Sequence, residues 1–119
     1  MSGPILIARA YDPPGDDGAR LLVDRLWPRG ISRQALRLSG WLRDVAPSDA
    51  LRRWFHADRS RWPDFAARYR SELQANPQAV ADCLDWCRRG PVTLLTAARD
   101  PTHSHVPVLR AYLLSSAAS

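Results

Sequence analysis

Two short, uninterrupted apolar runs most constrain the fold of this chain. The segment "ARLLVDRLW" (19–27) has an apolar middle, and "PVTLLTAA" (91–98) is apolar almost throughout. Strands of this kind are typical of a parallel sheet that is covered on both faces. A third segment, "PILIARAYD" (4–12), alternates less regularly and also predicts a strand. We therefore expect a small, mostly parallel sheet flanked by helices, which is an α/β fold.

Helical periodicity and capping residues predict the elements around this sheet. The predicted helices, each with the residue expected to cap or begin it, are a short helix or turn at 32–37, a helix at 49–57 (Ser48), a helix at 63–75 (Pro63), a helix capped by Asn76 with Pro77 in its first turn and Gly90 just past its end, and a helix at 105–115 (Ser104). The last start is chosen because Pro107 then lies in the first turn, where its missing N–H costs nothing.

The length of the chain suits one domain over residues 1–119 with a single hydrophobic core. No apolar run approaches the roughly 20 residues that span a bilayer. The N-terminus also lacks the basic and apolar pattern of a signal peptide. We therefore expect a cytoplasmic protein with no membrane partner. Cys83 and Cys87 are too few for a zinc site of their own and are interpreted as small buried side chains.

Arginine supplies every positive side chain of this sequence. All 17 positive side chains are arginine, and the net charge is +5. A GC-rich genome would explain the absence of lysine, yet the charge still favours anionic partners. Nucleic acid is one such partner and a small anion is another, but the arginines are spread along the chain rather than gathered in one block, so composition alone favours nucleic acid only weakly.

Polar clusters follow both continuous apolar strands directly. The first is "DRLWPRG" (24–30), and the second is "ARDPTHSH" (98–105). Ligands of open parallel sheets bind outside the carboxyl ends of the strands, so these two loops predict a site. The residues expected to meet there are Asp24, Arg25, Arg29, Arg99, Asp100, His103 and His105.

These residue types have the chemistry of an anion site. Arginine forks bind phosphate or carboxylate oxygens in pairs, and histidine can exchange a proton near neutral pH. The assigned roles are anion binding for Arg25 and Arg29, acid or base for His103, orientation of that histidine for Asp24 or Asp100, a pocket wall for Trp27, close backbone approach for Gly30, and further ligand contacts for His56 and Arg99. Each residue also has a structural interpretation, as a strand-end ion pair, a core aromatic or an ordinary turn residue.

Four segments together resemble a known family over nearly the whole chain. They are "RLLVDRLWPRGI", "LRRWFHAD", "FAARYRSEL" and "TLLTAARDPTHSHVPVL". In this order they resemble the YeaO-like branch of the domain of unknown function 488 family. The resemblance implies a compact, Rossmann-like domain of the bacterial cytoplasm and brings no established biochemical role.

The resemblance also implies which residues form the family pattern. They are Asp24, Arg25, Trp27, Pro28, Arg29, Gly30, Trp54, Phe55, His56, Tyr69, Asp100 and His103. Longer relatives carry a cysteine-containing stretch and a Cys-His-Arg motif where this chain has Thr96 and "THSHVP", so thiol chemistry is not carried over. The common short form has lysine at the position of Arg99 and asparagine at that of His105.

Three functions remain open at this point. The first is binding, with or without hydrolysis or transfer, of a small phosphorylated or nucleotide-like anion. The others are a nucleic-acid-binding module and a non-catalytic structural or interaction domain. No phosphate-binding glycine motif occurs, and no metal or cofactor is expected.

Overall fold

A four-stranded sheet, parallel throughout, forms the centre of the molecule. The computed structural model describes residues 4–15 and 18–117. The strands lie in the order β1-β4-β2-β3, and all three neighbouring pairs are parallel. Their bounds are β1 (Ile5–Arg9), β2 (Ala19–Leu22), β3 (Gly40–Trp41) and β4 (Val92–Thr96). The predicted α/β fold class is confirmed.

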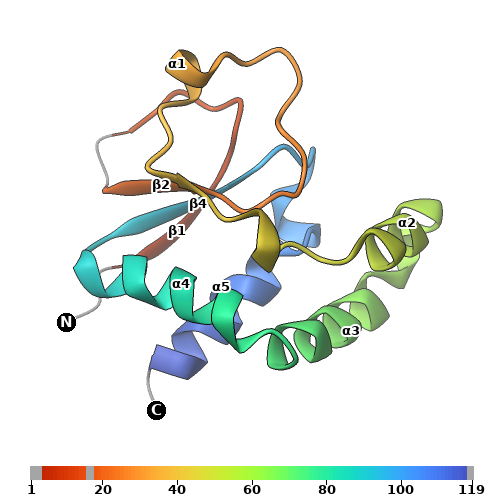
Figure 1. The fold of residues 1–119 in the computed structure, drawn as a ribbon. Helices are drawn as coiled ribbons and strands as arrows, with labels where there is room; N and C mark the ends of the chain where they lie inside the picture. The colour runs from red at the N-terminus through yellow and green to blue at the C-terminus, as the bar shows by residue number, and fades with distance from the viewer. Residues whose placement is uncertain (1–3, 16–17, 118–119) are drawn as a thin grey trace.

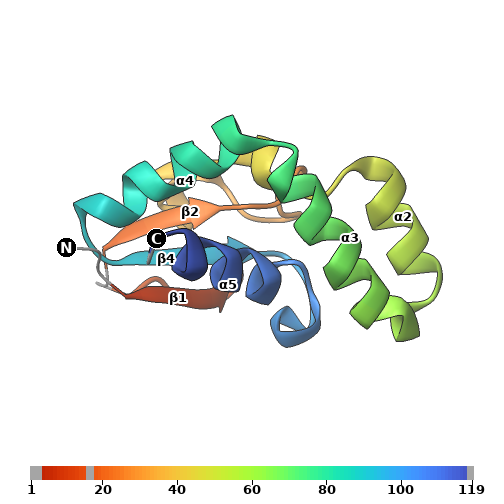
Figure 2. The ribbon, with the colours of Figure 1, turned by 90° about the horizontal axis from the view of Figure 1, so that it is seen from below.

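Helices cover the sheet and extend beyond its carboxyl edge. They are α1 (Arg33–Leu36), α2 (Asp49–Ala57), α3 (Trp62–Gln74), α4 (Pro77–Arg89) and α5 (Val106–Ala117), with the short 3-10 turns η1 (Arg43–Val45), η2 (Arg59–Arg61) and η3 (Pro101–His103). Helices α4 and α5 lie on one face of the sheet, and α1 with its flanking loops lies on the other (Figure 1). The β2 arrow points toward the α2–α3 pair, which lies beyond the strand ends (Figure 2).

The continuous apolar strands are explained by two buried clusters on opposite faces of the sheet. Leu21 and Leu94 pair across β2 and β4 and pack into the larger cluster with α3, α4 and α5. Leu22 and Leu95, the next pair along, pack into a smaller cluster with Leu36 of α1. Successive side chains of a strand point to opposite faces, so a strand buried on both faces must be apolar at every position.

The predicted helix starts are correct in position, and one capping interaction is wrong. The Ser48 side chain accepts a hydrogen bond from the first turn of α2, as expected. Ser104 accepts one from the backbone N–H of Val106 at 3.1 Å. Asn76 precedes α4 but does not cap it with its side chain, which instead donates to the carbonyl of Asp44 at 2.9 Å. That contact ties the start of α4 to η1.

The second strand is shorter than its apolar pattern predicts. It ends at Leu22 rather than at residue 27. The N–H of Val23 still donates to Leu95, but the carbonyl of Asp24 accepts from the indole of Trp41 instead of a strand partner. The chain therefore leaves the sheet within "DRLW". Strand β3, of two residues, was not predicted because so short a strand has no periodicity to detect.

Cys83 and Cys87 are buried and unpaired on α4, which confirms their interpretation as small core side chains. Burial raises the pKa of the Cys83 thiol to about 12 and also raises that of Cys87. Within residues 4–15 and 18–117, no helix has the length and apolar character needed to cross a membrane.

Candidate functional site

A cavity of about 380 Å³ lies at the carboxyl ends of β2 and β4. The segment after β2 lines it with residues 24–29, and the segment after β4 lines it with residues 96–99. Residues 103–105, just before α5, and one face of α2 complete the wall. The two loops predicted to meet at this edge of the sheet therefore border one cavity.

Most of the predicted site residues line this cavity. They are Asp24, Arg25, Trp27, Arg29, His56, Arg99 and His103, together with His105. Gly30 and Asp100 are not among its lining residues in the described part of the chain. Gly30 has a φ of 78° and so serves the turn, and Asp100 acts on a lining residue, His103.

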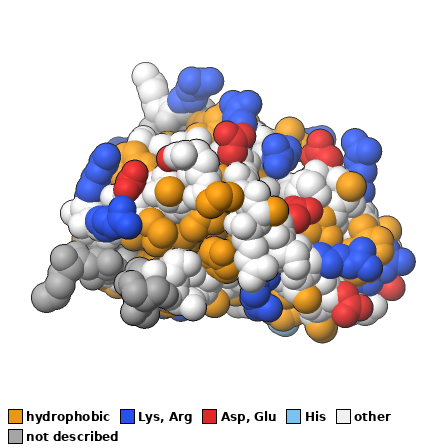
Figure 3. All heavy atoms as spheres, turned by 60° about the horizontal axis from the view of Figure 1, so that its bottom comes forward, with side chains coloured by type: hydrophobic (Ala, Val, Ile, Leu, Met, Phe, Trp, Pro, Cys, Tyr) orange, Lys and Arg blue, Asp and Glu red, His pale blue; other side chains and the backbone are white. Residues whose placement is uncertain are grey.

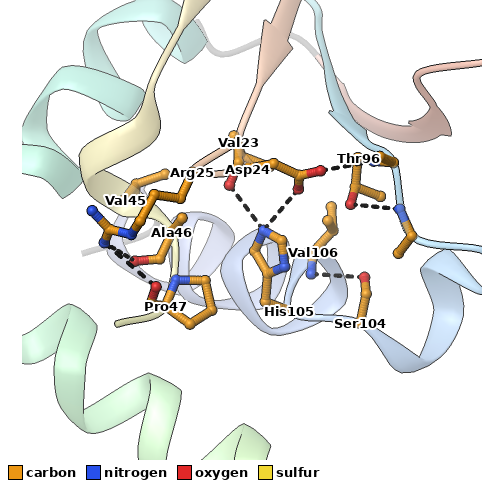
Figure 4. A network of polar contacts seen from close by, with 12 residues as sticks. Val23, Asp24, Arg25, Val45, Ala46, Pro47, Thr96, Ser104, His105 and Val106 are labelled. Atoms are coloured by element: carbon orange, nitrogen blue, oxygen red, sulfur yellow. Dashed lines mark hydrogen bonds and ion pairs between the residues drawn. The ribbon is translucent and has the colours of Figure 1, made fainter. Parts of the chain in front are cut away.

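Asp24 and His105 join the three segments that border the cavity (Figure 4). The Asp24 carboxylate accepts a hydrogen bond from the backbone N–H of Ala97, after β4, at 2.8 Å. Its other oxygen lies 3.5 Å from Nε2 of His105, and this Nε2 is 2.9 Å from the carbonyl of Val23. Both side chains are largely buried, so this contact set holds the ends of β2 and β4 against the start of α5.

Burial has the largest effect on the pKa of His105. Burial lowers the pKa of this imidazole, although the Asp24 carboxylate and the Val23 carbonyl both act to raise it. The edge of its ring packs on buried Tyr69 with 5.7 Å between ring centroids. A neutral imidazole that carries its proton on Nε2 can donate to Val23, so His105 is a positioning residue of the cavity wall.

Arg25 borders the cavity without being neutralised by a buried carboxylate. One terminal nitrogen is 3.3 Å from the carbonyl of Ala46 and 3.4 Å from that of Pro47 (Figure 4). Its Nε is 3.9 Å from the carboxylate of Asp49, a side chain that is 56% exposed. The guanidinium thus spans from the β2 loop to the segment before α2.

Arg29, after β2, and Arg99, after β4, are exposed arginines that line the cavity. The hydroxyl of Tyr11 donates to the backbone carbonyl of Arg29 at 3.0 Å and so anchors the loop but not the guanidinium. Tyr11 also lines the cavity. The loop that carries Arg29 is therefore anchored, while both arginine side chains are exposed.

Trp27 belongs as much to the fold as to the cavity. Its indole N–H donates to the carbonyl of Ile31 at 2.8 Å, and its ring packs edge-on against Trp41. It also contacts the smaller core cluster. Replacing Trp27 is therefore expected to lower the stability of the fold as well as change the cavity wall.

Asp100 and His103 form an exposed pair on η3. Asp100 caps this turn by accepting from Thr102, and its second oxygen lies 2.8 Å from Nδ1 of His103. Hydrogen bonds from Thr102 and then His103 lower the pKa of Asp100. The edge of the His103 ring faces Trp62. Asp100 is thus the carboxylate that orients His103, whereas Asp24 contacts His105 instead.

The cationic face of α2 was recognised only in part from the sequence. Arg52 and His56 are four residues apart on α2, so they lie on one side of the helix, and Arg59 follows in the 3-10 turn η2; all three border the cavity. Only His56 was predicted. Burial lowers the pKa of His56, and the positive charges of Arg59 and Arg52 lower it further. Helical spacing within "LRRWFH" is the signal that would have found Arg52, whereas Arg59 lies beyond the end of α2, where this spacing no longer applies.

The cavity combines a cationic border with an aromatic base. Its arginines are Arg25, Arg29, Arg52, Arg59 and Arg99, against one lining carboxylate, Asp24. Phe55 and Phe65 stack with 4.3 Å between ring centroids and contribute apolar surface. This arrangement suits an anion that carries an apolar body.

Nucleophilic and metal chemistry have little support in the described residues. The Ser104 hydroxyl donates to the carbonyl of Pro101, and the Thr96 hydroxyl accepts from Ala98. No group of three or more histidine, cysteine, aspartate or glutamate side chains is placed to hold a metal ion there.

Comparison with known proteins identifies the family. A family model described as the inactive DUF488-N3 subclade matches residues 4–119. The chain belongs to this family. The expected resemblance to the domain of unknown function 488 family is thereby confirmed.

Two bacterial relatives are similar over most of their lengths. The uncharacterized protein YeaO of Escherichia coli (strain K12) is 40% identical over 108 residues, which cover 90% of this chain and 94% of the relative. The uncharacterized protein Rv3073c of Mycobacterium tuberculosis (strain ATCC 25618 / H37Rv) is 43% identical over 106 residues, or 88% of this chain and 89% of the relative. No solved structure matches the chain significantly.

Proposed function

We propose that this domain binds a small organic anion, such as a phosphate ester, in the cavity at the carboxyl ends of β2 and β4. The observation that carries the proposal is the charge around the cavity, where five arginines face one lining carboxylate. A concave site lined by positive charges raises the local concentration of anions. The stacked Phe55 and Phe65 supply apolar surface for the rest of the ligand.

We further propose that the domain binds this anion without converting it. The description of its family as inactive supports this, and so does the chemistry of the lining. The two cysteines lie on α4 with raised pKa values, and the lining hydroxyls of Thr96 and Ser104 already have backbone partners. The exposed Asp100–His103 pair would be the acid or base if turnover occurred.

Calorimetric titration at low ionic strength with phenyl phosphate, inorganic phosphate and benzyl alcohol tests the proposal. Phenyl phosphate is expected to bind more tightly than inorganic phosphate, because its ring removes apolar surface from water. Benzyl alcohol is not expected to bind. High salt should weaken the binding of both phosphates. The proposed function would be refuted if neither phenyl phosphate nor inorganic phosphate gave a heat of binding.

Two variants connect the binding to this cavity. The double variant Arg29→Gln/Arg99→Gln removes two exposed lining charges and should weaken phenyl phosphate binding about fivefold, since each exposed charge contact contributes roughly 0.5 kcal/mol. Arg53→Gln/Arg70→Gln is the control, because Arg53 of α2 and Arg70 of α3 are exposed arginines that are not among the lining residues, and their replacement removes the same two charges. Equal weakening by both changes would indicate a nonspecific effect of net charge.

Turnover is tested with para-nitrophenyl phosphate, whose hydrolysis releases a coloured product. We expect no release above the uncatalysed rate. Release that disappears in His103→Gln would overturn the non-catalytic part of the proposal and assign the acid or base role to His103.

Nucleic acid is the alternative partner, and two observations weigh against it. An arginine guanidinium already lies over the rings of Trp27, Trp41, Trp54 and Trp86. On the face seen in Figure 3, arginines are scattered among acidic and apolar side chains. Anisotropy titrations with single- and double-stranded oligonucleotides decide the matter, since binding to phosphates must weaken steeply with salt.

A further inference from the structure

Arg25 and Arg52 approach the same carboxylate from different parts of the fold. Arg25 lies in the loop after β2, and Arg52 lies in α2. Nε of Arg25 is 3.9 Å from Oδ1 of Asp49, and a terminal nitrogen of Arg52 is 3.5 Å from the same oxygen. Both arginines line the cavity, whereas Asp49 is not among its lining residues.

Each of these two arginines has a buried donor that no acceptor reaches. Nε of Arg25 and Nε of Arg52 are both inaccessible to solvent and have no hydrogen-bond partner. Charge-assisted hydrogen bonds between arginine and an oxyanion are about 2.7–2.9 Å long, so Asp49 attracts the pair without satisfying these donors. Buried donors are rarely left unpaired, and an unpaired one calls for a physical explanation.

We propose that Arg25 and Arg52 form the seat for the anionic group of the ligand, and that Asp49 is an internal competitor for this seat. The inference rests on the proposed function and assigns residues to it. A phosphate that takes the place of the Asp49 carboxylate between the two guanidinium groups would give the Nε donors an acceptor. The Asp49 side chain is 56% exposed, so it can turn into water when the anion arrives.

A purely structural role for the cluster makes a different prediction. If Asp49 only joins the β2 loop to α2, then Asp49→Asn lowers stability and leaves ligand affinity unchanged. If Asp49 competes with the ligand, Asp49→Asn tightens the binding of phenyl phosphate. We expect a gain of about fivefold, equivalent to the upper range for an exposed ion pair.

Asp64→Asn is the matched control for this variant. Both aspartates are exposed and lie in the first turn of a helix, Asp49 in α2 and Asp64 in α3. Both changes remove one negative charge and one favourable interaction with a helix N-terminus. Asp64→Asn should therefore reproduce the loss of stability but not the gain in affinity. Equal affinity gains in the two variants would overturn the competitor role.

Arg52→Lys tests the seat itself. Lysine keeps the charge and lacks the planar fork, so it cannot reproduce the Nε contact. We expect phenyl phosphate to bind about tenfold more weakly, as for a lost charge-assisted hydrogen bond. Arg53→Lys on the same helix is the control, and circular dichroism verifies that the variants are folded. Arg25→Lys is a second variant, with the same expected direction.

The outcomes separate this inference from the proposed function. If phenyl phosphate binds neither the wild type nor Asp49→Asn, the proposed function and the seat both fail. If it binds the wild type and is weakened by Arg29→Gln/Arg99→Gln, but Arg52→Lys and Asp49→Asn leave its affinity unchanged, the function stands and the seat is refuted.

Discussion

Replacing Gly18 with alanine should destabilise the protein far more than the same change at Gly30. Both glycines have a positive φ, 81° at Gly18 and 78° at Gly30. An alanine at either position therefore bears a similar backbone strain of about 1–2 kcal/mol. The two sites differ in space, because a Cβ at Gly18 would lie 2.2 Å from the carbonyl oxygen of Pro91, whereas a Cβ at Gly30 has nothing within 4 Å.

The contact at Gly18 is costly because the obstructing atom is backbone. The Pro91 carbonyl accepts the hydrogen bond from Ala19 that begins the pairing of β2 with β4. Moving this carbonyl away adds about 1–3 kcal/mol of overpacking and about 1 kcal/mol of lost hydrogen bond. The total for Gly18→Ala is about 3–6 kcal/mol, against about 1–2 kcal/mol for Gly30→Ala.

Urea unfolding followed by circular dichroism measures this difference. The midpoint should fall much further for Gly18→Ala than for Gly30→Ala, with similar slopes in both variants. Equal midpoints would refute the claim that a Cβ at Gly18 clashes with the Pro91 carbonyl.

Three further predictions concern buried groups. Tyr69→Phe removes the hydroxyl that donates to the carbonyl of Val45 at 2.7 Å and leaves that buried acceptor unpaired. The free energy of unfolding, measured by urea titration, should therefore fall by about 1–3 kcal/mol. An unchanged free energy of unfolding would mean that water replaces the hydroxyl. Burial lowers the pKa of His105 in the folded state, so the unfolded chain takes up more protons as the pH falls below the ordinary value of 6.5. Stability should therefore decrease with acidification through that window and decrease less in His105→Gln, and an unaltered pH dependence in the variant would contradict this assignment. Cys83 and Cys87 are buried with raised pKa values, so a thiol reagent should label them at mildly alkaline pH only after unfolding, whereas rapid labelling of the native protein would disprove their burial.

The sequence was sufficient for the elements with strong local signals. Continuous apolar runs identified β2 and β4, because residues buried on both faces of a sheet must all be apolar. Ser48 identified the start of α2, since its hydroxyl satisfies a free N–H of the first turn. The topology of parallel sheets then located the cavity at the two strand ends.

Contacts between distant segments could not be predicted from these local signals. The end of β2 depends on Trp41, which takes the carbonyl of Asp24 and draws the loop away from the sheet. The side chain of Asn76 contacts Asp44 rather than its own helix because η1 lies beside it in the folded chain.

The sequence by itself determined that the chain forms a parallel α/β domain with polar segments where its apolar strands end, because periodicity and capping are local properties. Only the tertiary structure decided which charges meet there. The position of α2 beyond the strand ends brings Arg52 to the same carboxylate as Arg25 and leaves a donor of each unpaired. This convergence depends on how helices pack, which no single segment encodes.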